Sequence, residues 1–243
     1  MQQDHIEIAK KGGIALDVKT VIATARQLSA TNNWAVLQAI LLIFSGLFIA
    51  LFVVSSGYTF QTIEDVERFI REVGATFGFF QTIITAPLWT GVAMMAILSL
   101  RGQPYSIGLL IRYLPQLPML GLAALLVGFA IEIGFYLLFV PGFYVLMATT
   151  FAMPLIADQG KSPLEAIKTS FQITNAYIFK IATIYLIIFS LFIMVLLSFG
   201  FAIIFVGAFY FNLKAVLYQT LCCARVDRKQ DTPTNDDTGV FNA

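Results

Sequence analysis

Long apolar runs without charge constrain this sequence more than any other feature. Residues 34–56 contain no charged side chain, and residues 80–100 contain none either. A helix needs about 20 apolar residues, rising about 1.5 Å each, to cross about 30 Å of hydrocarbon. The chain is 58% hydrophobic and 12% charged, whereas a soluble domain is about half apolar and about a quarter charged. We therefore expect an all-α membrane protein in which these two runs are the first two spans.

Two longer apolar stretches are each predicted to form a hairpin of two helices. Residues 117–156 are about twice as long as one span requires. Pro141 and Gly142 mark the reversal, because proline ends helices and glycine supplies turn conformations, which places spans at 117–138 and 141–156. Residues 178–221 divide in the same way at Ser198, Phe199 and Gly200. The predicted fold is a polytopic transmembrane bundle of about six spans over residues 34–221.

The positions of lysine and arginine predict that both chain ends lie in the cytoplasm. These cations are retained on the cytoplasmic side of short loops. Among the outer loops of this arrangement, only the first contains cations, Arg68 and Arg71, and it also contains four acidic residues. Residues 1–33 form a cytoplasmic segment, and residues 222–243 form a cytoplasmic tail predicted to be disordered because it is poor in apolar side chains. The inner cations are Lys10, Lys11, Lys19, Arg26, Arg101, Arg112, Lys161, Lys168, Arg225, Arg228 and Lys229.

Amphipathic segments precede or connect several spans. Apolar residues that recur three or four positions apart lie on one face of a helix, which predicts helices on the membrane surface or against the bundle. Ser162 followed by Pro163 and Glu165 is a typical helix start. The apolar stripes are Ile63, Val66, Ile70, Val73 and Phe77 on the outer side, and on the inner side Val18, Val21, Ala25 and Leu28, then Ile107, Leu110, Ile111 and Leu114, and finally Leu164, Ile167 and Phe171.

An internal repeat is one interpretation of the pattern. Residues 23–34 and 166–177 share a Thr-Asn-x-aromatic motif at the entry to the first and fifth predicted spans. The segment after Arg101 and Gly102 parallels the one after Gln159 and Gly160, although it lacks the Thr-Asn motif. These similarities predict a threefold repeat of an interfacial helix followed by a transmembrane hairpin. The alternative is that polar residues followed by Trp or Tyr recur at membrane surfaces because of depth alone.

Three stretches carry a resemblance to a known family. They are Leu-Phe-Val-Pro-Gly at 138–142, Phe-Ala-Met-Pro-Leu-Ile-Ala-Asp at 151–158 and Ser-Pro-Leu-Glu-Ala-Ile-Lys-Thr-Ser at 162–170. The chain resembles uncharacterised bacterial inner-membrane proteins of the YciC type, a group related to the membrane domain attached to some glycerophosphodiester phosphodiesterases. The resemblance implies a bacterial inner-membrane location. It transfers no catalytic residue, because the phosphodiesterase chemistry resides in a separate domain.

No residue pattern predicts an enzyme, a cofactor or a metal site. Catalysis requires a nucleophile with a base, paired carboxylates or metal ligands. The single histidine, His5, lies in the polar N-terminal segment. Cys222 and Cys223 lack zinc-site spacing and are expected to be reduced thiols at a helix end. The net charge of +1 gives no basic field for nucleic acid, so the predicted partners are membrane lipid and another membrane protein or a second copy.

Three polar residues inside the predicted spans are candidate functional residues. Glu132 lies within the third span, where a carboxylate costs several kcal/mol unless it is paired, protonated or hydrated. It is a candidate for a proton or ligand role, and the alternative is an interfacial structural carboxyl. Asn212 and Lys214 lie in the last span. Asn212 is expected to form interhelical hydrogen bonds or to line a cavity, and Lys214 is expected to extend to the cytoplasmic surface on its flexible stem.

These features support two hypotheses for function. The first is a non-enzymatic scaffold or accessory subunit that engages lipid or another membrane protein through its amphipathic helices. The second is a small-solute or ion transporter or channel that uses Glu132. Transporters often contain broken helices at mid-membrane, and Pro87 and Pro154 are the predicted places for such breaks.

Overall fold

The computed structural model describes residues 2–198, 200 and 202–223, and every regular element in that part of the chain is a helix. The predicted all-α fold is therefore confirmed. Five helical segments are long and apolar enough to cross a membrane, so the protein is membrane-embedded. They are Trp34–Ser55, Ile63–Leu100, Leu109–Leu137, Phe139–Gln159 and Ile178–Leu197.

The N-terminal region forms two helices, α1 (Gln2–Lys10) and α2 (Val18–Ser55). Asp17 caps α2 by accepting hydrogen bonds from the backbone N–H groups of Lys19 and Thr20. The 38 residues of α2 extend for about 57 Å at about 1.5 Å per residue. The amphipathic segment predicted within residues 1–33 and the first span are thus one continuous helix. In addition, α1 buries Ile6 and Ala9 and packs against two later helices, α9 (Pro163–Ala176) and α11 (Ile203–Cys222).

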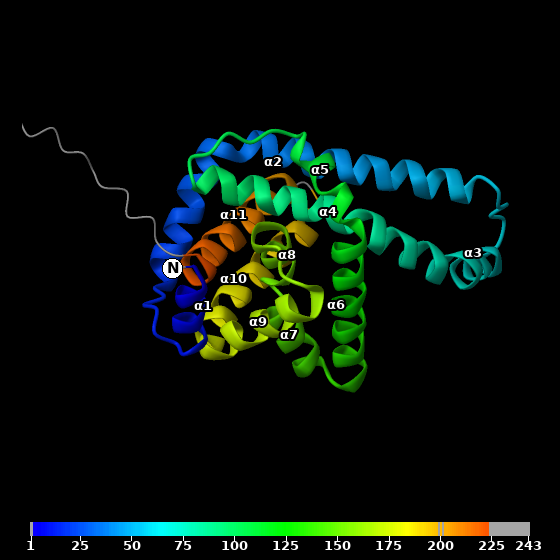
Figure 1. Ribbon diagram of the computed structural model, residues 1–243. Coiled ribbons are helices and arrows are strands. Elements are labelled where there is room, and N and C mark those ends of the chain that lie inside the picture. Colours follow the sequence, from blue (N-terminus) through cyan, green and yellow to red (C-terminus); the bar gives the residue numbers. More distant parts are fainter. Residues whose placement is uncertain (1, 199, 201, 224–243) are drawn as a thin grey trace, which may run out of the picture.

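The second long helical segment consists of α3 (Ile63–Phe69), a π-helical turn (Ile70–Gly74) and α4 (Ala75–Leu100). A capping box of Thr62 and Asp65 begins it. Figure 1 shows that α2 and α4 extend as a hairpin beyond the rest of the molecule, with α3 at its tip. The first part of the predicted outer stripe is exposed there, and Ile63 is 81% accessible, whereas Val73 and Phe77 are half-buried. Pro87 lies inside α4 without interrupting it, so the break predicted there is absent.

The third predicted interfacial helix is shorter than the sequence pattern indicates. It comprises α5 (Leu109–Arg112) and a 3₁₀ turn (Leu114–Gln116). Leu110 is buried, whereas Ile111 on the same predicted stripe is exposed. Pro115 explains the early end of α5, because proline has no backbone N–H to continue a helix. The next helix, α6 (Leu117–Leu137), matches the third predicted span closely.

The hairpin after α6 turns at Leu138, and α7 (Phe139–Ala148) follows it. Pro141 lies in the first turn of α7 and does not form the reversal itself. A Cβ at Gly134 would lie 2.8 Å from the Cα of Gly142, so this glycine allows α6 and α7 to approach closely. The fourth predicted span is broken, because α8 (Ala152–Gln159) begins only after residues 149–151. Pro154 favours this break, since its ring conflicts with the carbonyl of Thr150 in a continuous helix.

The C-terminal half comprises α9 (Pro163–Ala176), α10 (Ile178–Leu197) and α11 (Ile203–Cys222). Ser162 caps α9 with Pro163 in its first turn, as predicted. The predicted hairpin between α10 and α11 is also present, with Gly200 at a φ of +88°. The stripe predicted for α9 is not its packed face, since Leu164 is exposed. The residues that α9 buries are Ala166, Thr169, Ser170, Ile173 and Thr174.

The sixth predicted span corresponds to α11, which is not among the five segments found within the described residues. It packs between α2 and α4, where Leu213 and Leu217 are fully buried. Its helical segment is therefore an interior element of the bundle.

Two further predictions concern the chain termini and the repeat. Cys222 and Cys223 are buried at the end of α11 and do not belong to a tail. Residues 224–243, which include Arg225, Arg228 and Lys229, lie outside the described residues. Residues 23–34 lie inside α2, whereas residues 166–177 include the junction of α9 and α10. The two motif segments differ in local geometry, so the threefold repeat stays a prediction.

Candidate functional site

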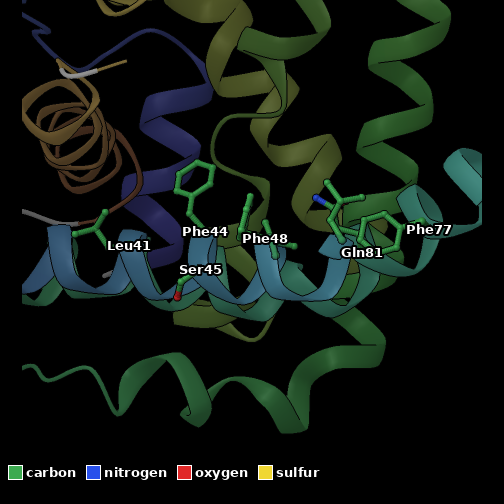
Figure 2. A pocket seen from close by; sticks show the side chains of 8 residues that line it. Leu41, Phe44, Ser45, Phe48, Phe77 and Gln81 are labelled. Carbon is green, nitrogen blue, oxygen red and sulfur yellow. The ribbon is translucent and has the colours of Figure 1, made fainter. Parts of the chain in front are cut away.

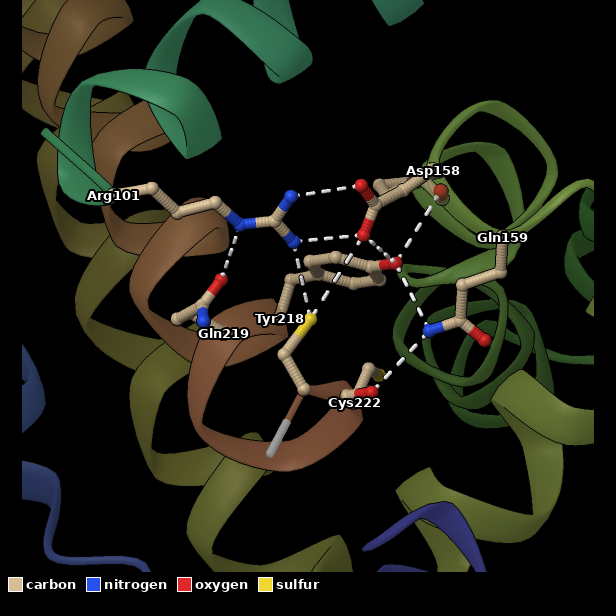
Figure 3. A network of polar contacts seen from close by, with 8 residues as sticks. Arg101, Asp158, Gln159, Tyr218, Gln219 and Cys222 are labelled. Atoms are coloured by element: carbon tan, nitrogen blue, oxygen red, sulfur yellow. Dashed lines mark hydrogen bonds and ion pairs between the residues drawn. The ribbon is translucent and has the colours of Figure 1, made fainter. Parts of the chain in front are cut away.

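A polar network joins the ends of α4, α8 and α11 at one end of the bundle (Figure 3). Arg101 immediately follows α4 and Asp158 lies in the last turn of α8. Arg101 Nη1 donates to Asp158 Oδ1 at 2.8 Å, and Nη2 donates to Oδ2 at 2.7 Å. This two-point geometry is the strongest arrangement for an arginine and a carboxylate. We call the network the polar clamp, and its members are Arg101, Asp158, Gln159, Tyr218, Gln219 and Cys223.

Residues of α11 and α8 satisfy the remaining polar atoms of this ion pair. Tyr218 donates its hydroxyl hydrogen to Asp158 Oδ2 at 2.9 Å, and Arg101 Nε donates to Gln219 Oε1 at 2.9 Å. Gln159 Nε2 donates to the Tyr218 oxygen and to the Cys222 carbonyl, both at 3.2 Å. A partly buried ion pair needs such additional hydrogen bonds to offset its desolvation. The clamp therefore fixes the three helix ends to one another.

The clamp also makes its cysteine unreactive. Arg101 Nη2 lies 3.2 Å from Cys223 Sγ. Burial nevertheless raises the pKa of the Cys223 thiol to about 11, because the thiolate loses its hydration. The hydrogen bonds that Arg101 donates to Asp158 raise the pKa of Arg101 above its ordinary value. At neutral pH the clamp therefore contains a neutral thiol and a permanent ion pair, and it offers no activated nucleophile.

The sequence pattern did not identify the clamp. In the sequence, Arg101 was noted only as a cation of an inner loop, and Asp158 only as part of the stretch that carries the family resemblance. The two residues are 57 positions apart. One signal was available. Both residues lie at the cytoplasmic ends of predicted spans, the second and the fourth, so they share a depth in the membrane.

The break between α7 and α8 is held by a side chain from α9. Ser170 donates its hydroxyl hydrogen to the Ala148 carbonyl at 2.6 Å and accepts from the Phe151 N–H at 3.1 Å. In hydrocarbon, backbone groups released by a break must find partners within the protein. This requirement explains why α9 turns a polar face inward, and it is the physical reason that its predicted apolar stripe is not the packed face.

Lys214 lies near this break, and its side chain direction corrects the expectation from sequence. Its Nζ donates to the Tyr210 hydroxyl at 3.1 Å and lies 5.0 Å from the centre of that ring. Tyr210 is one turn earlier in α11, so the side chain points away from the C-terminal end of the helix. Side chains on helices lean toward the N-terminus, which favours this contact over extension to the surface. Tyr185 of α10 is also within electrostatic range, and its hydroxyl hydrogen-bonds that of Thr150 in the break.

Asn212 joins α11 to α2, as one of its two predicted roles requires. It is fully buried, and its Nδ2 donates to the Ser29 hydroxyl oxygen at 2.9 Å. Ser29 in turn donates to the Ala25 carbonyl at 2.8 Å. Oδ1 of Asn212 is buried without a hydrogen-bond partner. The interhelical hydrogen bond predicted for this residue is therefore present.

Glu132 lies on the outer surface of α6, apart from the polar clusters. Its side chain is exposed, and no ion pair to it occurs among the described residues. Phe129 and Ile133 beside it are also exposed. His5 belongs to the ordered helix α1, where its Nε2 lies 3.2 Å from the Thr220 carbonyl oxygen. Within the described part of the chain, neither Glu132 nor His5 is brought to a second group with which it could perform acid–base catalysis.

An open apolar groove of about 550 Å³ lies between the outer part of α2 and the first turns of α4 (Figure 2). Phe44 and Phe48 line it from α2, and Phe77 and Gln81 line it from α4. The Ser45 hydroxyl donates to the Leu42 carbonyl of its own helix. The carboxamide of Gln81, by contrast, makes no hydrogen bond with any described residue. The groove is thus apolar except for one unsatisfied amide.

The described residues contain no cluster of His, Cys, Asp and Glu side chains that could hold a metal ion. Comparison with known proteins gives no relative: no family model, no curated protein and no solved structure matches this chain. The candidate sites therefore rest on their own geometry.

Proposed function

We propose that this protein is a non-enzymatic scaffold or accessory subunit of the bacterial inner membrane, with both termini in the cytoplasm. It binds a transmembrane helix of another membrane protein in the groove between α2 and α4. The observation that supports this function most directly is the groove itself, which is open and apolar on a hairpin that extends beyond the bundle. The resemblance to YciC-type proteins supports the bacterial location.

The chemistry of Gln81 favours a helix over a lipid chain as the occupant. An acyl chain would fill the apolar groove but would offer no hydrogen-bond partner to the carboxamide. Glutamine side chains hydrogen-bond across helices in membranes, so a helix with a polar side chain at this depth satisfies the amide. Gly78, three residues earlier on α4, has no atom within 4 Å of a Cβ built on it. That open space lets a second backbone approach closely.

Site-specific photo-crosslinking in the native membrane tests this proposal. A crosslinking residue at Phe48 lies in the groove, and one at Leu186 lies on the exposed face of α10 as the control. We expect the Phe48 position alone to give one defined protein adduct. The adduct should disappear in Gln81→Leu and in Gly78→Leu, and should persist in Gly128→Leu, where the added side chain also meets open space.

Two results would contradict the proposal. Identical adducts from both positions would show that the groove has no preferred occupant. Adducts to lipid alone at Phe48, unchanged by Gln81→Leu, would show that lipid fills the groove. An adduct between two copies of this chain would make the protein a scaffold through self-association.

Transport is the second candidate function, and the break between α7 and α8 is the observation that favours it. Transporters bind their substrates at such discontinuous helices. The exposed position of Glu132 on α6 makes it a weaker candidate than Lys214 for a transport residue. Flux in proteoliposomes that is lost in Glu132→Gln but kept in Lys214→Gln would contradict this reassignment.

A further inference from the structure

Polar residues of α10, α11 and the break between α7 and α8 lie at a similar depth inside the bundle. Lys214 precedes Cys222, the last residue of α11, by eight positions, and Thr150 precedes Asp158 of the clamp by the same interval. The interval in α11 corresponds to about 12 Å along the helix, and Thr150 lies two residues before the first residue of α8. Tyr185 is seven positions after Ile178, the first residue of α10, which corresponds to about 10 Å. The group therefore lies within the hydrocarbon layer, whose half-thickness is about 15 Å.

The charge of Lys214 is uncompensated at this depth. An ammonium group carries three N–H donors, and the described contacts assign one of them, to the Tyr210 hydroxyl. None of the ion pairs of the described residues includes Lys214. Charged residues inside membranes are normally paired with an opposite charge or face a polar pathway. The neutral phenol of Tyr210 and its ring compensate the charge of Lys214 less completely than a carboxylate would.

The neighbours of Lys214 are hydroxyl groups. Tyr210 contacts it directly, Tyr185 lies within electrostatic range, and Thr150 is hydrogen-bonded to Tyr185. Thr150 is in the broken segment, where Ser170 already satisfies the backbone groups of Ala148 and Phe151. The hydroxyl of Thr150 lies between the Tyr185 hydroxyl and the Leu146 carbonyl, which is 3.4 Å away. A cation surrounded by hydroxyl donors, with no acid among them, is chemically suited to an anion.

We infer that Lys214, Tyr185, Tyr210 and Thr150 form a binding site for the oxyanion group of an anionic ligand, a carboxylate or a phosphate. Lys214 supplies the positive charge, and the hydroxyl groups donate hydrogen bonds to the remaining oxygens. Discontinuous membrane helices recur at sites for anionic substrates. This site is distinct from the groove between α2 and α4, so it stands whether or not a partner helix binds there.

Thermal unfolding of the purified full chain in neutral detergent tests the site. The probes are inorganic phosphate and octanoate, each compared with sodium chloride at equal ionic strength. Ligands that bind the folded state raise the unfolding midpoint. We expect one of the probes to raise it in the wild type and in Lys180→Gln, which alters an exposed lysine near the start of α10. In Lys214→Gln the same probe should bind roughly tenfold more weakly or worse, because a charged hydrogen bond is lost.

A second variant keeps the inference testable if Lys214→Gln does not fold. Tyr185→Phe removes one hydroxyl, and Thr150 retains the Leu146 carbonyl, 3.4 Å away, as an acceptor. We expect a roughly fivefold loss of probe affinity in this variant. Nanodiscs of phosphatidylglycerol and of phosphatidylcholine distinguish the source of the anion. Stabilisation by phosphatidylglycerol that requires Lys214 identifies a lipid headgroup, whereas stabilisation by soluble phosphate or octanoate identifies a free ligand.

The inference fails if neither phosphate, octanoate nor phosphatidylglycerol stabilises the wild type beyond its control. It also fails if the stabilisation is equal in the wild type, Lys214→Gln and Tyr185→Phe. In that case Lys214 is a structural lysine held by Tyr210.

Discussion

Asp158 connects three helices through a single carboxylate. It accepts from Arg101 after α4 and from Tyr218 of α11, while its own backbone belongs to α8. Removing one member of a buried ion pair is more costly than removing both, because the remaining charge stays desolvated. Removing the Asp158 carboxylate therefore destabilises the protein mainly because the Arg101 guanidinium stays partly buried without its opposite charge.

We predict that Asp158→Asn lowers the free energy of unfolding by about 2–3 kcal/mol, somewhat less than for a fully buried pair because water still reaches the clamp. Thermal unfolding in mild detergent measures the change. Glu165→Gln is the matched control, since its ion pair with Lys161, which precedes α9, lies at the surface and should contribute at most about 0.5 kcal/mol. Equal effects of the two substitutions would show that the clamp does not fasten the helices.

The raised pKa of Cys223 predicts a steep pH dependence of alkylation. With a pKa of about 11, roughly one thiol in a thousand is ionised at pH 8, and the thiolate is the reactive form. In a Cys222→Ala variant, the labelling rate of the folded protein should rise about tenfold per pH unit from pH 7 to pH 10. Unfolding in dodecyl sulfate should remove the protection. Rapid labelling of the folded protein at pH 7 would contradict the buried position of this thiol.

At the scale of helices, the hairpin of α6 and α7 depends on a close backbone approach. Gly134 faces the Cα of Gly142 so closely that a Cβ would lie 2.8 Å away, whereas Gly128 on the same helix has no atom within 4 Å of such a Cβ. The two glycines therefore have different roles, although both lie in α6.

We expect Gly134→Ala to destabilise the protein by about 1–3 kcal/mol, because the added methyl group forces the two backbones apart. Gly128→Ala should be neutral or should stabilise by up to about 1 kcal/mol through helix propensity. Thermal midpoints of the two variants, measured side by side, give the comparison. A larger loss at Gly128 than at Gly134 would place the helix contact elsewhere.

At the scale of the whole molecule, the positions of the cations and the clamp support the orientation that we propose for the protein, with the clamp on the cytoplasmic side. The clamp, α1 and the end of α11 lie together, so one face of the bundle gathers the polar helix ends. The tip of the α2–α4 hairpin with α3 lies far from them (Figure 1). With the clamp in the cytoplasm, this tip belongs on the opposite side.

Reporter fusions measure this topology. Green fluorescent protein should fluoresce when attached to either end of the chain, because it matures in the cytoplasm. Alkaline phosphatase inserted after Gln61, in the loop before α3, should be active, because that enzyme folds outside the cytoplasm. Activity of alkaline phosphatase at either chain end, with none at Gln61, would reverse the proposed orientation.

The sequence by itself determined the features that depend on local chemistry. The lengths of the apolar runs predicted membrane helices, Gly200 marked a hairpin, and Ser162 with Pro163 marked the start of α9. Each of these follows from hydropathy or from backbone preferences within a few residues. The same reasoning also suggested that Asn212 would bond across helices, although it could not name Ser29 as the partner.

Only the tertiary structure decided which polar groups meet. Ser170 faces inward because the α7–α8 break needs a donor and an acceptor, and Lys214 turns toward Tyr210 instead of the membrane surface. The pairing of Arg101 with Asp158 joins residues on different helices. Periodicity shows which face of a helix is apolar, but a polar group in a membrane is placed by whichever partner satisfies it. That partner is fixed by the packing of helices distant in sequence.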